Sequence, residues 1–484
     1  MIPQILVITA TLGDRDTLQR TIDSVRSIGG NDVKHIIIAP KEKIPIIRDK
    51  YDNITCIPEP EGKNGIYPAL NYAFQTYGRD YRYLTFINDD DYWLPNFRIL
   101  ITAIQSGDFD FVYGKTKYMD VYSVPIGEQT SSKQFKDFIP LLFSNIALLT
   151  QQATIIRSEW FFKLDGFDES YKLVADSKFW AMLSLEKVKY HYFNSYCAAY
   201  SIQDGQLSSD HEAQGLEHVR MLSELPNVSQ HKVKLAKIRF RMVNVGIYVK
   251  RFLAKRKILN PFRGGGKIIN LFTCLMPWKI KRWILIHLYG YEIDKTAYIG
   301  LSYIFPDHLI MKARSRIGHL NVAIHLHLVS MEEDCDICQE VWITGYPKWK
   351  KDFFAKFGDR YPALIMRKNS ALTKKHLVDC TDVVDIGEYT SIGGYGTQIL
   401  SHSTSLALND QSCAPIKIGH HCFVGTRSII LPGAVLPNQS VLGAGALLQK
   451  KYEEPQSLYG GVPARFIKKV NMEYAFFTRT TRRR

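Results

Sequence analysis

The first 210 or so residues alternate short apolar runs with amphipathic stretches. Apolar runs at 5–9, 35–39 and 83–87 have the length of buried strands. Stretches at 16–27 and 69–77 have the spacing of amphipathic helices that lie between such strands. Alternating strands and helices are typical of an α/β fold, so this pattern predicts a sheet covered by helices.

From about residue 297 to residue 470 the apolar positions recur with a period of six. Neither a strand, with period 2, nor a helix, with period 3.6, produces such a repeat. A parallel β-helix does, because each six-residue step forms one flat face and sends one aliphatic side chain inward. We therefore predict a parallel β-helix. The inward positions form two series: Ile299, Phe305, Met311, Ile317, Ala323, Val329, Cys335 and Val341, then Ile418, Val424, Ile430, Leu436, Leu442 and Leu448.

The period of six breaks twice, and breaks in a solenoid mark loops. One break lies between Val341 and Ile386 and contains the charged, aromatic segment 348–361. The other separates Ile392 from Ile418 by 26 positions, where a multiple of six gives 24. We expect two extra residues to bulge from the β-helix there.

The charge of the chain is concentrated between these two regions. The 484 residues carry 62 Lys and Arg against 47 Asp and Glu, a formal net charge of +15. Residues 231–290 hold fifteen of the basic side chains and no acidic one. Subtracting 15 from 62 leaves 47 basic and 47 acidic side chains elsewhere, so the two patterned regions together are neutral.

Part of the basic segment has the pattern of an amphipathic helix, with Lys and Arg around one apolar stripe. Such a helix fits the surface of an anionic membrane. A packed helical spacer is an open alternative, whereas we expect no nucleic-acid partner because no nucleic-acid-binding fold accompanies the charge. A second apolar and basic stretch follows at 267–288. The stripe consists of Leu235, Ile238, Met242, Val245, Val249 and Phe252.

Length and cysteine content narrow the class of protein. At 484 residues, 46% hydrophobic and 23% charged, the chain has the composition of a globular protein with two or three domains. Eight scattered cysteines and no charged-then-apolar leader indicate a reduced, cytoplasmic protein. The longest uncharged apolar run, 268–278, is shorter than the roughly 20 residues that span a bilayer.

The end of the β-helix region resembles the hexapeptide-repeat O-acyltransferases, whose fold is a left-handed β-helix. The resemblance extends over about 170 residues and implies acyl transfer from acetyl-coenzyme A to a hydroxyl group. It also implies active sites between the subunits of a homotrimer. Three segments carry it: Ile416-Lys-Ile-Gly-His-His-Cys-Phe-Val-Gly-Thr-Arg-Ser-Ile-Ile-Leu-Pro-Gly, Leu442-Gly-Ala-Gly-Ala and Gly460-Gly-Val-Pro-Ala-Arg.

Two histidines of this region are candidates for the chemistry. An imidazole with a pKa near neutrality can take the proton of a sugar hydroxyl as it attacks a thioester. By the resemblance, His402 on the bulged loop is the catalytic histidine; the alternative is a solvent-exposed loop residue. His376, beside Asp379, is a second candidate: an inward or cleft-facing imidazole there could orient the substrate, and the alternative is a surface histidine.

Binding of coenzyme A requires backbone amide groups along its pantetheine arm and basic groups at its phosphates. Phe423 stands where the family usually has Trp, which leaves a packing role intact. By the resemblance, the residues expected to bind coenzyme A are Gly425, Ala444, Gly445 and Arg465.

Three consecutive carboxylates follow the apolar run at 83–87. Asp89, Asp90 and Asp91 repel one another, so a positive group must offset them. Carboxylate oxygens suit Mg²⁺ or Mn²⁺, which makes a divalent ion the natural candidate. Taken alone, the run is equally compatible with a solvated turn.

In its context the run resembles the family 2 glycosyltransferases, which have the GT-A (Rossmann-like) fold. The resemblance extends over about 200 residues. Four segments occur in the order of that family: Glu59-Pro-Glu-Gly-Lys-Asn-Gly-Ile-Tyr-Pro-Ala-Leu-Asn, Phe86-Ile-Asn-Asp-Asp-Asp-Tyr-Trp-Leu-Pro, Gly166-Phe-Asp-Glu-Ser and Ala175-Asp-Ser-Lys-Phe-Trp.

This resemblance implies a nucleotide-sugar donor whose diphosphate is bridged by a metal ion held at Asp91. Asp89 and Asp90 would hold the ribose or the donor sugar. Asp176 would deprotonate the acceptor hydroxyl for inverting transfer; its alternative role is a helix N-cap. Other residues expected at the donor are Thr11, Asp14 and Asn71.

Two departures from the family bear on the donor. Ala39-Pro-Lys-Glu-Lys replaces the acidic turn that holds the nucleobase, and Gln151-Gln152 replaces a family histidine. The missing acid weakens the inference about the nucleotide. It leaves open a glycan-binding domain without glycosyltransferase activity.

We therefore predict an α/β GT-A-like domain at 1–215, a basic helical connector at 216–292, a left-handed parallel β-helix at 293–470 and a basic tail at 471–484. The expected function is bifunctional: sugar transfer to a glycan acceptor and O-acetylation of the same glycan, in bacterial capsule or other surface polysaccharide synthesis. We expect a cytoplasmic enzyme, peripheral at the inner face of the cell membrane through 232–288. The remaining alternative is acetylation of a small sugar or a nucleotide sugar.

Overall fold

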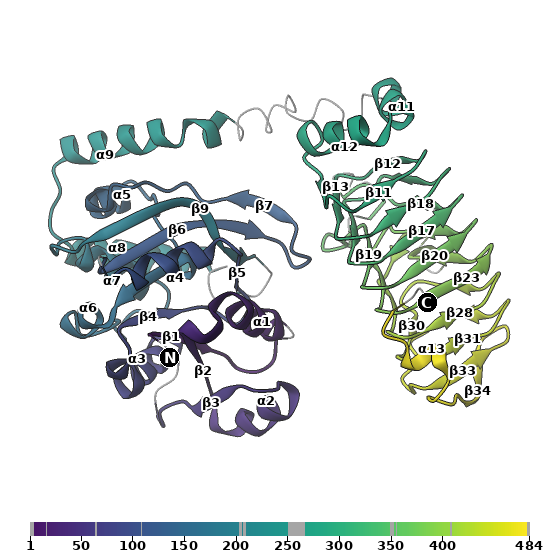
Figure 1. Ribbon diagram of the computed structural model, residues 1–484, viewed down its shortest axis with the longest axis horizontal. Helices are drawn as coiled ribbons and strands as arrows, with labels where there is room; N and C mark the ends of the chain where they lie inside the picture. Colours follow the sequence, from purple (N-terminus) through teal and green to yellow (C-terminus); the bar gives the residue numbers. More distant parts are fainter. Residues whose placement is uncertain are drawn as a thin grey trace. The chain divides into compact units, whose positions relative to one another are not determined.

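The computed structural model describes residues 4–481, apart from 16, 63–64, 108, 203–205, 207–209, 250–266, 349–352, 355 and 407–408. The chain forms two compact units, residues 1–252 and 253–484 (Figure 1). The basic segment contributes helices to both units. Phe252 of the predicted apolar stripe lies outside the described residues.

A mixed sheet forms the centre of the N-terminal unit. Its strand order is β3-β2-β1-β4-β8-β6-β9-β5, with β7 paired to β6, and the first four strands are parallel. The strands expected at 5–9, 35–39 and 83–87 are β1, β2 and β4. The bounds are β1 Ile5–Ala10, β2 Val33–Ala39, β3 Thr55–Pro58, β4 Tyr83–Phe86, β5 Tyr92–Trp93, β6 Phe111–Met119, β7 Pro125–Glu128, β8 Thr154–Arg157 and β9 Tyr190–Ser201.

Helices cover both faces of this sheet (Figure 1). The alternation along β1 requires this, because Leu6 and Ile8 pack with α3 whereas Ile5 and Val7 pack with α4. The predicted α/β fold is confirmed. The helices are α1 Leu18–Gly29, α2 Ile44–Lys50, α3 Ile66–Tyr77, α4 Phe97–Gln105, α5 Phe138–Leu142, α6 Ser158–Lys163 and α7 Ala175–Leu183.

The first helices of the predicted connector belong to the N-terminal unit. They are α8 His211–Glu224 and α9 Gln230–Val243. α9 buries Ala236 and Phe240 in the same core as α5, and Arg239 forms an ion pair with Asp137 of that unit at 2.6 Å. This helix is therefore a packed part of the unit.

Three sheets form the walls of the C-terminal unit, and all their strands are parallel except β34, which pairs antiparallel with β33 (Figure 1). Each coil adds one strand to each sheet, and the inward side chains of the series from Ile418 to Leu448 are completely or almost completely buried. The predicted left-handed parallel β-helix is confirmed. The first sheet contains β10 Glu292–Ile293, β13 His308–Met311, β16 Leu328–Met331, β19 Ala363–Met366, β22 Val384–Ile386, β27 Ile416–Ile418 and β30 Val435–Leu436. The second contains β11 Tyr298–Ile299, β14 Arg316–Ile317, β17 Asp336–Gln339, β20 Ala371–Lys374, β23 Ser391–Tyr395, β28 Phe423–Val424, β31 Val441–Leu442, β33 Ser457–Gly460 and β34 Arg465–Lys469. The third contains β12 Tyr303–Phe305, β15 Val322–Ile324, β18 Trp342–Thr344, β21 Leu377–Asp379, β24 Gln398–Leu400, β29 Ile429–Ile430 and β32 Leu447–Leu448.

Three details of the predicted six-residue register are wrong. Ile304, and not Phe305, is the buried residue of β12. Ile317 pairs with Ile337, twenty positions on, so Ile337 and not Cys335 is the inward strand residue of that coil. Cys335 is buried in the preceding turn. Ile386 pairs with Ile418, 32 positions on, whereas a regular coil such as Ile418 to Leu436 takes 18, so the insertion holds fourteen residues and not two. Strands pair only between complete coils, so the length of an insertion follows from the pairing. Counting six-residue faces along the sequence does not give that length.

Helices close the N-terminal end of the β-helix. α11 Lys267–Leu275 and α12 Trp278–His287 pack on its first coils, and Leu285 joins the β-helix core. At the other end the tail includes α13 Ala475–Thr478, and Arg479 donates to the carbonyl of Tyr389. No helix among the described residues has both the length and the apolar character needed to cross a membrane.

Candidate active sites

The insertions of the β-helix leave it at one corner, where the chain passes from the third sheet to the first. Segments 345–362, 380–383 and 401–415 follow β18, β21 and β24 at this corner. The last of them contains the hairpin β25 His402–Ser405 and β26 Asp410–Cys413. Neighbouring strands in a sheet lie about 4.8 Å apart. Residues at the ends of β21 and β24, Asp379 and His402 among them, are therefore neighbours.

Asp379 holds the imidazole of His402. Its Oδ2 lies 2.6 Å from Nδ1 of His402 and accepts the backbone N–H groups of Ser401 and His402, both at 3.1 Å. Thr381 donates its hydroxyl to Oδ1 at 2.8 Å. The Asp379 side chain is 6% exposed and that of His402 is 43% exposed. A carboxylate bound to Nδ1–H leaves Nε2 as the nitrogen that can take a proton.

The electrostatics of this pair favour a charged carboxylate and a basic imidazole. The hydrogen bond to Asp379, together with its charge, raises the pKa of His402 above the ordinary value. Burial acts to raise the pKa of Asp379, but the hydrogen bonds from His402, Thr381 and Ser401 outweigh it, so that pKa is lowered. Asp379 therefore stays ionised while His402 gains affinity for a proton.

The 345–362 insertion borders His402. Phe354 is buried and presents its edge to the imidazole, with ring centroids 6.2 Å apart. Arg360 packs over Phe354 and donates to three backbone carbonyls. Lys356 forms an ion pair with Asp410 of the β25–β26 hairpin at 2.9 Å. The two insertions are thus joined beside His402.

His376 does not lie in this site. It is buried, its Nε2 is 3.0 Å from the hydroxyl of Thr373, and its Nδ1 accepts the N–H of Thr397 at 3.2 Å. Burial lowers its pKa to about 4. His376 is therefore an inward-facing residue and not a surface histidine, and Asp379 bonds to His402 instead of His376.

The residues predicted to bind coenzyme A lie at a different corner. Gly425, Ala444 and Gly445 follow β28 and β31, where the second sheet turns into the third. A Cβ at Gly425 would lie 2.6 Å from the backbone nitrogen of Ala444, so glycine is needed for the coils to stack. Ala444, Gly445 and Arg465 of β34 are exposed. Within one chain the third sheet separates this corner from His402.

In the N-terminal unit, hydrogen-bond donors enclose Asp91. Its Oδ1 accepts the backbone N–H of Ser201 at 2.8 Å. Its Oδ2 accepts from the side-chain amides of Gln152 at 2.7 Å and Asn88 at 3.1 Å. The side chain is wholly buried, and burial raises its pKa well above the ordinary value. A metal ion would have to displace these donors, so Asp91 does not fit the predicted role of metal ligand.

Asp89 and Asp90 share the guanidinium of Arg15. Its Nη1 lies 3.2 Å from Oδ1 of Asp89 and 2.5 Å from Oδ2 of Asp90. Thr11, at the end of β1, donates its hydroxyl to Asp89 at 2.7 Å, and the amide of Gln206 donates to Asp90 at the same distance. This carboxylate cluster follows the carboxyl ends of β1 and β4, where α/β sheets bind their ligands.

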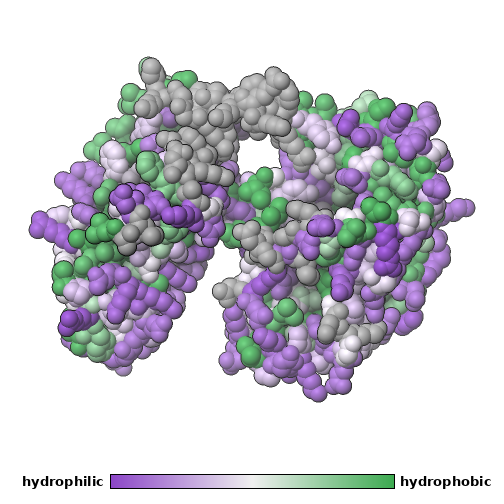
Figure 2. Space-filling model, turned by 180° about the vertical axis from the view of Figure 1, so that it is seen from behind, coloured by the Kyte–Doolittle hydropathy of each residue, from purple (hydrophilic) through white to green (hydrophobic). Residues whose placement is uncertain are grey.

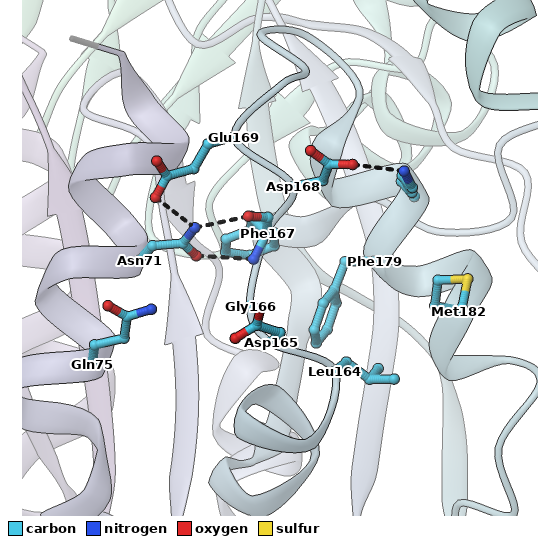
Figure 3. A pocket seen from close by; sticks show the side chains of 11 residues that line it. Asn71, Gln75, Leu164, Asp165, Gly166, Phe167, Asp168, Glu169, Phe179 and Met182 are labelled. Atoms are coloured by element: carbon cyan, nitrogen blue, oxygen red, sulfur yellow. Dashed lines mark hydrogen bonds and ion pairs between the residues drawn. The ribbon is translucent and has the colours of Figure 1, made fainter. Parts of the chain in front are cut away.

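Asp14 and Asn71 are not hydrogen-bonded to this cluster. Asp14 is exposed and forms an ion pair with Lys43 at 2.7 Å. Asn71 is buried and clamps Phe167, donating Nδ2–H to its carbonyl at 2.8 Å and accepting its N–H at 2.9 Å (Figure 3). The clamped segment, α3 and α7 line a cavity of about 560 Å³ that the carboxylate cluster does not line. In the structure, the contacts of Asn71 hold a loop in place.

Asp176 lies in the first turn of α7. Its Oδ1 accepts the N–H of Ser177 at 2.7 Å and the hydroxyl of Tyr67 at 3.1 Å. The N-cap of this helix is Val174, so Asp176 is not the capping residue. Desolvation by burial raises the pKa of Asp176, which is the direction that makes a carboxylate a better base near neutral pH.

Both units are similar to known proteins. Residues 6–164 match the model of the family described as glycosyl transferase family 2. This part of the chain is a family 2 glycosyltransferase domain. The galactoside O-acetyltransferase of Escherichia coli K12 is 37% identical over 57 residues, which are 12% of this chain. The chain spans 28% of the length of that curated relative.

Solved structures also resemble the chain. Residues 1–349 of TarS from S. aureus, in complex with UDP-GlcNAc, have 16% sequence identity and a TM-score of 0.37, covering 53% of this chain and 79% of that fragment. A hexapeptide-repeat acetyltransferase from Vibrio cholerae, complexed with acetyl-coenzyme A, has 16% identity and a TM-score of 0.24, covering 42% of this chain and 83% of its own.

The carboxylates of the family 2 domain allow a test of the predicted metal. Mg²⁺ is commonly held by one or two carboxylates together with substrate phosphates. Asp89 and Asp90 supply such a pair beside the Arg15 cation, whose place a metal ion would take; the Asp90 side chain is 4% exposed, and the donors that enclose Asp91 are neutral. Among the described residues no group of three or more His, Cys, Asp or Glu side chains is placed to hold an ion. The pair Asp89 and Asp90 therefore fits a divalent ion bound jointly with a diphosphate.

Sequence reasoning missed two residues of these sites. Arg15 comes directly after Asp14, which was expected near the donor, and its charge was the available signal. Asp379 was noticed beside the wrong histidine. Its contact with His402 depends on the stacking of two coils, which a linear pattern does not reveal.

Proposed function

We propose that this chain is a bifunctional enzyme that transfers a sugar from a nucleotide sugar to a glycan acceptor and O-acetylates a sugar hydroxyl with acetyl-coenzyme A. The single observation that carries the proposal is the Asp379–His402 pair on a β-helix fused to a family 2 domain. The likeness of the β-helix to an O-acetyltransferase supports acetyl as the group and oxygen as its acceptor. The proposal places both activities on one glycan, in the synthesis of a surface polysaccharide.

In acetyl transfer, Nε2 of His402 takes the proton of the sugar hydroxyl while its oxygen attacks the thioester carbonyl. The tetrahedral intermediate collapses, the C–S bond breaks, and the imidazolium returns the proton to the leaving thiolate. Asp379 keeps Nδ1 protonated and stabilises the imidazolium that forms. The products are the acetyl ester and free coenzyme A.

In sugar transfer, Asp176 takes the proton of the acceptor hydroxyl, whose oxygen attacks the anomeric carbon from the face opposite the nucleoside diphosphate. The C–O bond to the diphosphate breaks, and the anomeric configuration inverts. A Mg²⁺ or Mn²⁺ ion bound at Asp89 and Asp90 would neutralise charge on the leaving diphosphate. Arg15 contributes a positive charge at the same place.

The test is incubation of the full-length protein with a panel of nucleotide sugars, glycan acceptors and acetyl-coenzyme A, followed by mass spectrometry of the products. We expect acceptors that gain a sugar and acceptors that gain an acetyl group. Acetylated products without sugar transfer from any donor would support the alternative of a family 2 domain that only binds glycan. Acetylation of free sugars or nucleotide sugars alone would contradict a glycan acceptor.

If Asp90 and not Asp91 binds the metal ion, substitutions of the two residues should affect Mn²⁺ affinity differently. We expect Asp90→Asn to weaken binding of Mn²⁺ in the presence of a nucleoside diphosphate at least tenfold, measured by electron paramagnetic resonance. Asp91→Asn should leave Mn²⁺ affinity within about twofold. The Asp91→Asn variant should instead have a lower melting temperature. The carboxylate accepts hydrogen bonds from Ser201 and Gln152, and the amide group that replaces it would turn an N–H donor toward one of these donors, at a cost of about 1–3 kcal/mol.

Arg15→Ala supplies the matched control for that experiment. Removing the guanidinium leaves Asp89 and Asp90 without this ion pair, so we expect tighter Mn²⁺ binding. Loss of Mn²⁺ binding in Asp91→Asn with an unchanged melting temperature would contradict the assignment.

We also propose a homotrimer in which His402 of one subunit faces the coenzyme A corner of the next. The separation of the two corners by the third sheet within one chain supports this arrangement. His402→Ala and Ala444→Asp, each inactive in acetyl transfer, should regain part of the activity when they are co-expressed, because mixed trimers contain sites with neither defect. No recovery, together with sedimentation as a monomer, would contradict the trimer.

Acetyl-coenzyme A and nucleotide sugars are cytoplasmic metabolites, which supports a cytoplasmic location for both reactions. We further propose that the enzyme attaches peripherally to the inner face of the cell membrane through segment 232–288.

A further inference from the structure

Helix α11 is inverted with respect to ordinary amphipathic helices. It buries polar Asn270, which bonds to the hydroxyls of Tyr303 at 3.2 Å and Tyr289 at 2.6 Å. Its large apolar side chains point the other way: Phe272 is 60% exposed and Leu275 is 62% exposed. A helix that only capped the β-helix would bury these side chains and expose the amide.

Helix α12 buries Leu285 in the β-helix core, but it buries a lysine beside it. Lys281 is 3% exposed, and its ammonium donates to the carbonyls of Gly300 at 2.8 Å and Ser302 at 3.3 Å. Its neighbours Ile280 and Trp283 are 51% and 57% exposed. The buried ammonium is satisfied by the β-helix, so the outward apolar side chains are the unexplained part of this helix.

Helix α9 carries a third exposed apolar face, on the N-terminal unit. Each residue advances about 100° around a helix, so Ile238 and Met242 lie roughly opposite the packed residues Ala236 and Phe240. They are 54% and 69% exposed. The apolar stripe recognised in the sequence is therefore not the face that packs on the unit. Leu235, Val245 and Val249 continue the same exposed stripe.

The charged residues of the three helices themselves are all basic. Segment 231–290 contains no Asp or Glu, and on α9 the exposed Lys234 and Arg241 flank the apolar stripe. Figure 2 shows hydrophobic residues at the surface, interspersed with hydrophilic ones. Exposed Trp, Phe and Leu bordered by Lys and Arg are the composition of helices that lie in a bilayer interface.

We propose that the outward faces of α11 and α12 on the C-terminal unit, and separately the outward face of α9 on the N-terminal unit, each dock on a bilayer that contains anionic lipids. The inference rests on the peripheral attachment included in the proposed function and assigns it to particular faces. A second copy of the chain is a poor occupant, because two such surfaces would bring like charges together. Apolar side chains insert among the acyl chains, while each Lys or Arg adds attraction to anionic headgroups.

The experiment is co-sedimentation of the full-length protein with vesicles of phosphatidylcholine, alone or mixed with phosphatidylglycerol. We expect binding to the mixed vesicles that weakens as salt rises from about 0.1 M to 0.5 M, because surface charge is increasingly screened. The variant Met242→Ser/Phe272→Ser/Trp283→Ser should lose about tenfold or more of the affinity. These side chains are exposed, so the variant should fold with an unchanged melting temperature.

The matched control is Leu216→Ser/Val219→Ser on α8, which removes apolar side chains that are 69% and 67% exposed outside the three faces. It should bind vesicles like the unaltered protein. Absence of binding to anionic vesicles at low salt, equal loss in the control variant, or concentration-dependent self-association that the triple variant abolishes would each overturn this proposal. Acetyl and sugar transfer to water-soluble acceptors should be unchanged in the triple variant, so failure of docking and failure of the proposed function give different results.

Discussion

Replacement of His402 by alanine should lower the rate of acetyl transfer by about 10²- to 10⁴-fold, the range that a positioned general base contributes. Nδ1 of this residue is held at 2.6 Å by a buried carboxylate, which leaves Nε2 to take the proton of the acceptor hydroxyl. Steady-state release of coenzyme A measures the effect. Sugar transfer in the same preparation is the control, and it should stay within about twofold of the unaltered enzyme. Loss of both activities, or of neither, would contradict two separate sites.

Asp379→Asn tests the positioning role by its pH profile. Asp379 raises the pKa of His402, and a base acts in its neutral form, so acetyl transfer should rise with pH through an apparent pKa above the ordinary histidine value. Without the carboxylate charge that pKa falls, and the rising limb should move to lower pH while kcat decreases. A variant that lost activity through misfolding would not shift the limb. An unchanged limb would show that the histidine titrated in catalysis is not paired with Asp379.

The β-helix was predictable because its repeat is imposed by the geometry of the coil. One inward aliphatic residue per face is required by the core, so Ile418 to Leu448 could be identified from spacing alone. Insertions are not subject to that requirement. The fourteen extra residues that place His402 beside Asp379 became evident only from the pairing of Ile386 with Ile418.

The carboxylate cluster shows a different limit of sequence reasoning. Three adjacent aspartates indicate a charged site, but they do not say which side chain points inward. In the structure Asp91 turns into the core toward Gln152 and Ser201, and Asp89 and Asp90 turn toward Arg15. The partners come from segments up to 110 positions away, and their approach depends on the order of strands in the sheet.

Helix α9 contains two apolar faces, which explains why its sequence allowed both a packed spacer and a membrane helix. Val233, Ala236 and Phe240 have the spacing of a packing face, and so do Leu235, Ile238 and Met242. Periodicity cannot rank two stripes on opposite sides of one helix. The contacts with α5 and Asp137 select the first as the buried face and leave the second exposed.

Asp176→Asn should lower sugar transfer by about 10²- to 10⁴-fold and leave acetyl transfer within about twofold, because the amide cannot accept the acceptor's proton. Tyr67→Phe is the graded variant. Its hydroxyl bonds to Asp176 and acts to lower the carboxyl pKa, so removing it should raise that pKa further. Since the base must be ionised, the acid limb of the sugar-transfer profile should move to higher pH. If Asp176→Asn retained full sugar transfer, or if Tyr67→Phe moved the limb to lower pH, Asp176 would not be the base.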